Sequence, residues 1–460
     1  RFDSWLTIFI IMVMAFGACC EYAPIGATRA NYSMFQDIHV MVALGFGFMG
    51  AWLHKNAFTS IGHCFMLCAF TSMWAILCIA GWHNAIGGHV WLKIQLGLTQ
   101  LIEADMAVAT VLISFGALLG RISAPQALIV AFLETIVYAM NRQLVADKWL
   151  ATDVGGSMTI HAFGACFGLA TSWALERNNE DRQTMDMKYD SFERSTKESD
   201  TFAMIGTLFM WCFWPSFNAA LAGGFAEIAV VNTYVALCCS CVMAFFFSGM
   251  LGRRQVRIRD IQRATLAGGV IVGACCNLIT ERIWGTLALG CTAGVMSVVG
   301  YRYIQPHLRS ARFKVIDTCG VHNLHGLPGI LGGLASISVA GVATVGKYTN
   351  THQGITPGDV YSRANTENWD AFFNQKLALY QFIALVVTLG ISITGGLITG
   401  TILRLPILRM HRYWHDSEEW LDCEDEEMDK LEKGQDEKEM AEFEDSEPVD
   451  AADAPAAVSS

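Results

Sequence analysis

Residues 153–161 read DVGGSMTIH and continue as AFGACFGLA, inside a long apolar run. Asp153 and His161 are costly in such a run, because a charged or strongly polar side chain in an apolar medium needs a partner. A second stretch, 317–325, reads DTCGVHNLH and is followed by the glycine-rich GLPGILGGL. In both stretches a histidine follows an aspartate by eight residues. In an α-helix eight residues span about 12 Å along the axis. We therefore expect each imidazole to lie about 12 Å beyond its aspartate along the helix.

The composition indicates an integral membrane protein. Of 460 residues, 53% are hydrophobic and only 16% are charged, a balance that a soluble domain of this size does not need. Twelve apolar runs are long enough to cross a bilayer. They cover 4–22, 35–53, 58–80, 96–119, 124–145, 153–175, 201–222, 226–250, 264–280, 283–304, 317–345 and 377–403. We therefore expect an all-α integral membrane protein with about twelve transmembrane helices.

The formal net charge of −11 is unevenly distributed. Residues 416–460 hold 19 acidic residues and 3 lysines, which leaves the rest of the chain near +5. An acidic segment with few apolar residues does not form a packed core. We expect a transmembrane domain over 1–405 and a largely disordered cytosolic tail over 406–460, either solvated or docking cytosolic partners. This charge distribution predicts no nucleic-acid partner.

Lysine and arginine between the apolar runs predict the orientation, because loops rich in them stay in the cytosol. Five arginines lie within 253–263, after the eighth run, and basic residues also follow the sixth, tenth and twelfth runs. An even number of spans then places both termini in the cytosol. Asn31 begins the sequon NYS in the first outer loop, which predicts glycosylation of a plasma-membrane protein. The chain starts at Arg1, and we leave open whether residues precede it, a cleaved signal peptide included.

This orientation makes the two Asp–His stretches inverted copies of each other. The sixth run, which holds the first stretch, crosses inward, whereas the eleventh run, which holds the second, crosses outward. His161 and His325 therefore converge on one depth near the bilayer midplane. Polar groups that meet there, one from each half, are typical of inverted-repeat transporters. We predict an inverted five-helix pseudo-two-fold repeat of about 35–175 and 201–345, with a small permeant.

Several motifs resemble the ammonium transporter and Rhesus glycoprotein family, and the Rhesus branch most closely. Besides the two stretches, they are FQDIHVMVALGFGF at 35–48, FWPSFNAA at 213–220 and ATLAGGV at 264–270. The motifs occur in order over roughly 1–405. The resemblance implies a homotrimer in which each protomer has its own narrow hydrophobic pore for ammonia or ammonium.

The resemblance also implies roles for residues along the pore. His161 and His325 match the twin histidines that line it, and Phe217 matches one of two stacked phenylalanines that gate it, although a packing role is the alternative. Where the second phenylalanine is expected, after Ala104 and Asp105, this chain has Met106. Arg142 stands where related Rhesus proteins carry an acid.

The remaining acids and His322 have two interpretations each. Asp153 and Asp317 match the two half-repeat aspartates, which either cap helices through backbone N–H groups or bind the ion. Asp105 and its neighbour Glu103 either cap a helix or attract ammonium. His322 lies on the same helix face as His325 and suggests a metal site, but no third ligand is apparent, so we predict neither metal nor cofactor.

Simple energetics favour a neutral permeant. Moving a bare cation into an apolar medium costs on the order of 20 kcal/mol by the idealised Born estimate. Removing the proton of ammonium near neutral pH costs only about 3 kcal/mol. We predict a Rhesus-type channel, not an enzyme, that recruits ammonium, deprotonates it and conducts ammonia down its gradient. The alternatives are a carbon dioxide conduit, an electrogenic ammonium transporter with a separate proton relay, and a membrane scaffold acting through its acidic tail.

Overall fold

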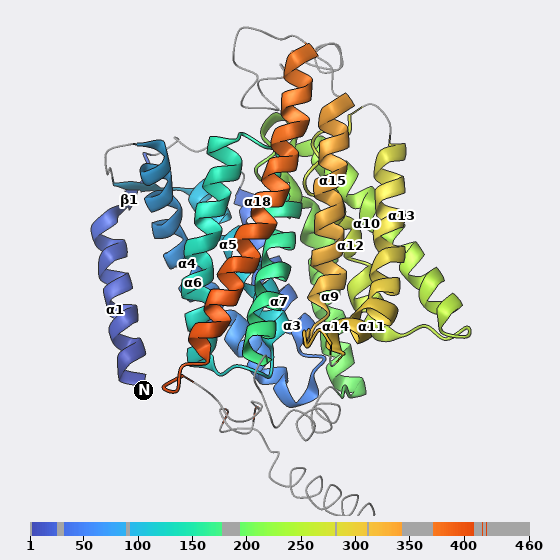
Figure 1. Ribbon diagram of the computed structural model, residues 1–460, viewed down its shortest axis with the longest axis horizontal. Helices are drawn as coiled ribbons and strands as arrows, with labels where there is room; N and C mark the ends of the chain where they lie inside the picture. Colours follow the sequence, from blue (N-terminus) through green and yellow to red (C-terminus); the bar gives the residue numbers. More distant parts are fainter. Residues whose placement is uncertain are drawn as a thin grey trace, which may run out of the picture. The chain divides into compact units, whose positions relative to one another are not determined.

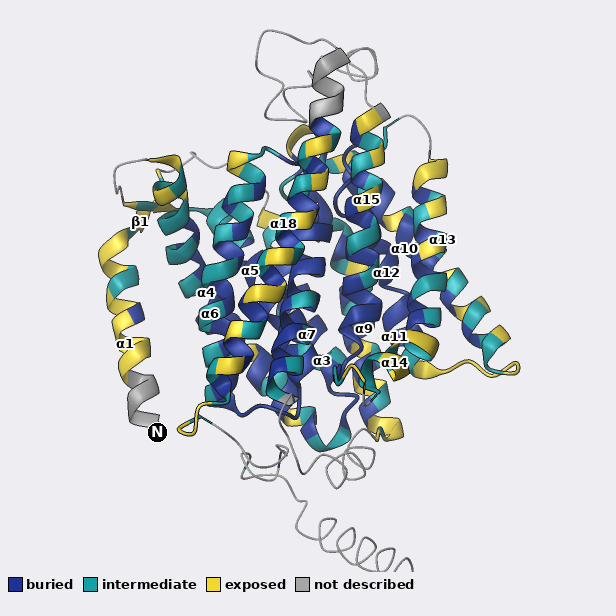
Figure 2. Ribbon diagram, viewed as in Figure 1, coloured by how far each residue is buried: buried dark blue, intermediate teal, exposed yellow. Residues whose placement is uncertain are grey.

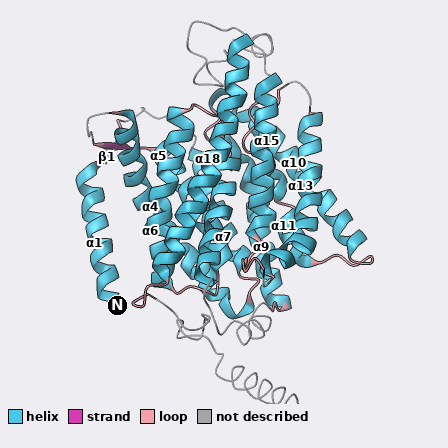
Figure 3. Cartoon of the chain, in the orientation of Figure 1, coloured by secondary structure: helices cyan, strands magenta, loops and turns pink. Residues whose placement is uncertain are grey.

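The computed structural model describes residues 2–24, 32–88, 93–176, 194–280, 283–310, 312–342, 371–408, 416 and 420. Nearly all of the regular structure in these ranges is helical (Figure 3). Strands β1 (Cys20–Tyr22) and β2 (Ile94–Leu96) form one short parallel pair. The chain divides into two units, residues 1–414 and 415–460.

The first part of the chain contains α-helices of varied length and short turns of π-helix (η1, η3, η4) or 3₁₀-helix (η2). They are α1 (Phe2–Cys19), α2 (Tyr32–Val40), η1 (Met41–Gly45), α3 (Phe46–Gly50), η2 (His54–Asn56), α4 (Ala57–Gly87), α5 (Leu98–Leu118), α6 (Ala124–Gln143), η3 (Leu144–Lys148), η4 (Ser157–Ala162) and α7 (Phe163–Glu176).

The second part of the chain follows the same pattern, with π-helical turns at η6 and η7 and a 3₁₀ turn at η5. Its helices are α9 (Lys197–Ala219), η5 (Gly223–Phe225), α10 (Ala226–Leu251), α11 (Ile258–Ala264), α12 (Ala267–Val272), α13 (Trp284–Val299), η6 (Gly300–Ile304), α14 (Gln305–Arg309), η7 (His322–Gly326), α15 (Leu327–Val342) and α18 (Ala371–Leu403).

Eight helical stretches among the described residues are long and apolar enough to cross a membrane. This confirms the predicted class, a mostly helical multi-pass membrane protein. The other four expected runs, at 4–22, 35–53, 201–222 and 264–280, do not meet the same criteria of length and hydropathy within the described ranges. A total of twelve spans and the inverted repeat therefore stay predictions.

The expected run 264–280 is not one continuous helix. Helix α11 ends at Ala264, α12 covers only six residues, and the chain beyond it turns without forming a helix up to residue 280. Its free backbone groups bond to Ser157, whose hydroxyl donates to the carbonyl of Val270 at 2.6 Å and accepts from the N–H of Ala274 at 2.7 Å. Irregular backbone at membrane depth is tolerated where protein groups satisfy it. The periodicity of the sequence does not reveal such a partner.

Among the eight long apolar stretches, the most deeply buried are α5 and the stretch formed by η4 and α7 (Figure 2). They pack against each other, and α18 packs against both α6 and α7, so that these helices run side by side (Figure 1). Helices α1 and α18 carry many exposed apolar side chains, as a helix does when one face contacts lipid. The turn η4, which carries His161, leads directly into α7 and is fully buried.

Candidate functional site

Asp153 holds the beginning of the helix that carries His161. Its carboxylate accepts hydrogen bonds from the N–H groups of Met158 and Thr159 at 3.1 and 2.7 Å, and from the Thr159 hydroxyl at 2.8 Å. Gly156 has φ +67°, a left-handed conformation that favours glycine. The chain therefore turns between Asp153 and residue 156 before the π-helical turn η4 begins.

Asp317 does the same for the helix that carries His325. Its carboxylate accepts from the N–H groups of Val321 and His322 at 2.9 and 3.0 Å. Gly320, again three residues after the aspartate, has φ +68°. A π-helical turn, η7, follows and leads into α15. The Nδ1 atom of His322 lies 2.7 Å from the same carboxylate, so His322 is bound to Asp317.

The two stretches thus share one local structure, in which the aspartate caps a helix. This geometry matches the capping interpretation of Asp153 and Asp317. The prediction of a continuous helix from each aspartate to its histidine is wrong. The first residues of each stretch instead form a turn around a glycine in the left-handed conformation. Among the described residues, no three His, Cys, Asp or Glu side chains gather closely enough to hold a metal ion.

His161 and His325 meet in the interior. Their Nδ1 atoms are 3.1 Å apart, and their rings are stacked with centroids 5.2 Å apart and planes at 13°. Only 0% and 1% of their surfaces are exposed. Between two neutral imidazoles such a contact requires one Nδ1 to donate and the other to accept, which means opposite tautomers. The Nε2 atom of His161 is buried without a hydrogen-bond partner among the described groups, which leaves it available to a small ligand.

Aromatic side chains surround the two imidazoles. Trp214 stacks on His161 at 5.5 Å, and Phe217 lies tilted against it at 6.0 Å. Phe46 stacks on the opposite ring, His325, at 6.1 Å. Of these three residues only Phe217 was predicted from the sequence, although Trp214 and Phe46 also lie within the family-like motifs. These rings exclude water from the histidine pair, whereas the imidazoles supply its polar groups.

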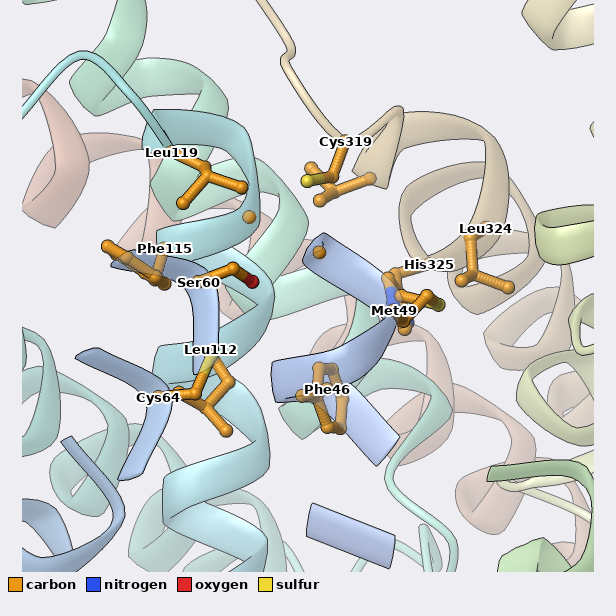
Figure 4. Close-up of a pocket in the computed structure, with 13 residues that line it drawn as sticks. Phe46, Met49, Ser60, Cys64, Leu112, Phe115, Leu119, Cys319, Leu324 and His325 are labelled. Atoms are coloured by element: carbon orange, nitrogen blue, oxygen red, sulfur yellow. The ribbon is translucent and has the colours of Figure 1, made fainter. Parts of the chain in front are cut away.

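A small chamber lies beside His325 (Figure 4). It has a volume of about 20 Å³, enough for one or two water-sized molecules. We call it the His325 chamber. Phe46, Leu112, Leu324 and Cys319 line it together with the imidazole. Apart from His325 and Ser60 its lining is apolar or thiol, so a neutral molecule is less costly there than an ion.

A larger cavity of about 320 Å³ lies beside the beginning of η4. We call it the Asp153 cavity. The residues that line it and bear on its chemistry are Met106, Arg142, Asp147, Asp153, Thr159 and Asn277. Ile160, the residue before His161, also lines it. The histidine pair therefore has this polar cavity next to the His161 segment and the apolar His325 chamber next to the other ring.

Charged groups around the Asp153 cavity are mostly paired. Arg142 donates to Glu103 at 2.7 Å, and Asp147 lies 3.1 Å from Nδ1 of His83. Glu103 is thus bound to an arginine rather than left to attract a cation. Glu103 therefore offsets the positive charge of Arg142. Nothing in the sequence indicated this pair.

The remaining predicted residues lie in different places. Asp105 does not line the Asp153 cavity; it is 3% exposed, and both of its oxygens lie 3.2 Å from Nδ1 of His39. Met106, the next residue, does line the cavity. Asn31, the predicted glycosylation site, lies outside the described residues.

Multi-pass helical membrane proteins that bury polar side chains within their helices are typically channels or transporters. The family model described as "Ammonium Transporter Family" matches residues 4–428. The chain belongs to the ammonium transporter family, as its motifs predicted.

Individual relatives and a solved structure are similar to this chain over most of its length. "Ammonium transporter Rh type B" of Danio rerio is 41% identical over 417 residues, covering 86% of this chain and 87% of the relative. Its namesake in Mus musculus is 40% identical, with 82% and 79% covered. The structure of Rh50 from Nitrosomonas europaea, of the Rhesus protein family of channels, aligns with a TM-score of 0.70 and 30% identity, covering 90% of this chain and 97% of that one.

Proposed function

We propose that the chain is a Rhesus-type channel that recruits ammonium, removes its proton and conducts ammonia down its gradient past His161 and His325. The observation that carries this proposal is the contact between the two buried imidazoles. His325 lines the His325 chamber, and the two residues before His161 line the Asp153 cavity. With opposite tautomers, one Nε2 is an acceptor and the other a donor. Ammonia donates and accepts hydrogen bonds, so it suits both.

The surroundings of the pair favour the neutral permeant. Ammonium would have to leave water for a site walled by Trp214, Phe217 and Phe46. Deprotonation at about 3 kcal/mol is cheaper than the several kcal/mol that remain for a desolvated ion after relaxation. In this proposal the polar lining of the Asp153 cavity holds ammonium, which gives its proton to water on the outer side before ammonia enters.

Other residues have supporting roles in the proposal. Phe217 and Met106 form the gate between the Asp153 cavity and the histidines. Asp153 and Asp317 hold the two histidine helices in place through their caps. Asp105 acts through its pair with His39 rather than by attracting ammonium directly.

We also propose an orientation, a membrane and an oligomeric state for the protein. It places the Asp153 cavity outside, both termini in the cytosol, and the chain in the plasma membrane as a glycosylated homotrimer. Large apolar side chains exposed on α9 and α10 provide surface for lipid or for a neighbouring copy; they are Phe202, Leu208, Val242 and Phe246. The acidic tail serves regulation or docking.

Flux into vesicles that contain the purified protein shows whether ammonia or ammonium crosses the membrane. Under an inward ammonium gradient the lumen should become alkaline, with no current and no effect of a clamped potential. An ion crossing the whole field would instead gain about 2.3 kcal/mol per 100 mV. His161→Ala should abolish or alter the response, whereas His307→Ala, at an exposed histidine, serves as the matched control. Wild-type ammonia flux in His161→Ala would refute the pore assignment.

One alternative has its own structural support. The direct contact between the Nδ1 atoms of His161 and His325 is a route for a proton, as an electrogenic transporter with a separate proton relay requires. A voltage-dependent current that scales with ammonium and disappears in His161→Ala would establish it. Carbon dioxide is the second alternative, because the His325 chamber is largely apolar. A carbon dioxide gradient across the same vesicles measures it as luminal acidification.

A further inference from the structure

Helix α2 lies between the two helices that carry the proposed gate residues. It packs against α5, which carries Met106, and against α9, which carries Phe217. Two of its polar residues, Asp37 and His39, are two positions apart and therefore point about 200° away from each other around the helix axis. Ile38, between them, is fully buried. One polar side chain can thus reach each neighbouring helix.

On one side, Asp37 binds the residue immediately before Phe217. The hydroxyl of Ser216 donates to a carboxylate oxygen of Asp37 at 2.6 Å. Pro215 precedes this serine inside α9 and lacks an N–H, so the helix loses one internal backbone bond at this point. The bond to Asp37 therefore anchors α9 where its own hydrogen bonding is weakest.

On the other side, His39 binds the residue immediately before Met106. Its Nδ1 lies 3.2 Å from both carboxylate oxygens of Asp105, whose side chain is 5% exposed. Phe35, one turn earlier on α2, stacks on the imidazole with centroids 5.6 Å apart and so restricts its rotation. A buried carboxylate depends on such a partner, because leaving it unpaired is expensive.

We propose that Asp37 and His39 are positioning residues that fix the separation of Phe217 and Met106. We call the pairs Asp37–Ser216 and His39–Asp105 the α2 clamp. The clamp sets the size of molecule that passes from the Asp153 cavity to the histidines. This inference rests on the proposed gate function of Met106 and Phe217. It assigns selectivity against larger amines to α2, a helix that does not line the Asp153 cavity.

The test measures selectivity rather than total flux. Vesicles with the purified protein are given gradients of ammonium or methylammonium, and the ratio of the two uptake rates is compared between variants. His39→Ala and Ser216→Ala should each raise the methylammonium share about tenfold, since a hydrogen bond to a charged group is worth roughly that factor in an equilibrium. Gln36→Ala, at an exposed position of the same helix, should leave the ratio unchanged.

Conservative variants separate positioning from mere stability. The Nδ2 atom of asparagine occupies the place of the histidine Nδ1, so His39→Asn should restore the wild-type ratio. Ser216→Ala removes only one hydroxyl and keeps the test informative if His39→Ala does not assemble. An unchanged ratio in Ser216→Ala, or a fall in flux with unchanged ratio in His39→Ala, would overturn the clamp.

Direct gate variants distinguish failure of the clamp from failure of the proposed function. Phe217→Ala and Met106→Ala alter the proposed gate itself. If they raise the methylammonium ratio while the clamp variants do not, the clamp is wrong and the gate stands. If neither set changes the ratio, the gate function is wrong and the clamp falls with it.

Discussion

Substituting alanine for Gly329 should separate His161 from His325. Gly329 lies in α15, one turn after His325, where this helix crosses η4. A Cβ atom there would lie 2.5 Å from the carbonyl oxygen of Ser157 and 2.8 Å from the backbone nitrogen of Ala162. Backbone atoms have no rotamer to change. Because ordinary contacts need about 3.5 Å, α15 must retreat by about 1 Å.

The size of the effect follows from this displacement. Overpacking of this kind costs typically about 1–3 kcal/mol of stability. Carried back one turn, a retreat of about 1 Å lengthens the 3.1 Å contact between His161 and His325 beyond the range of a hydrogen bond. In enzymes a misplacement of about 1 Å costs about a hundredfold in rate, and we expect ammonia flux to fall ten- to a hundredfold.

The assay is stopped-flow ammonia flux into vesicles, with thermal unfolding of the purified protein in detergent measured alongside. Gly341→Ala is the matched control, since it lies in the same helix and, among the described residues, its added Cβ would meet only Ala378, at 3.8 Å. The control should keep wild-type flux and melting temperature. Equal flux and stability in Gly329→Ala and Gly341→Ala would refute the packing of α15 against η4 and the dependence of transport on it.

Three further predictions concern the pore and the tail. His161→Ala and His325→Ala should each reduce or alter ammonia flux without loss of assembly by size-exclusion chromatography; wild-type flux and selectivity in both would remove the histidines from the pathway. Met106→Phe should leave flux comparable or slower, because a rigid ring closes the gate more tightly than the flexible methionine. Cysteine labelling at position 106 that places it away from the pore entrance would contradict this. Deleting 416–460 should leave flux in reconstituted vesicles intact and change only trafficking or regulation, and loss of flux would disprove it.

Properties that depend on short stretches of chain were accessible from the sequence. Apolar runs of membrane length indicated the class, because transfer of a helix into lipid depends on its own composition. The repeated eight-residue spacing singled out His161 and His325, since polar residues within such runs are energetically costly and usually functional. The structure brings these two residues together. The capping interpretation of the aspartates likewise needed only local sequence.

Properties that depend on how helices are rotated against each other were decided only by the tertiary structure. His39 and Asp105 are 66 positions apart, and Arg142 meets Glu103 rather than solvent. Periodicity predicts the face on which a side chain lies, but a pair also requires the relative rotation and height of two helices. The π-helical turns shift that rotation within single helices. Hydrogen bonds from Ser157, in another part of the chain, stabilise the break in 264–280. Those contacts exist only after the helices have packed, so no stretch of sequence read alone contains them.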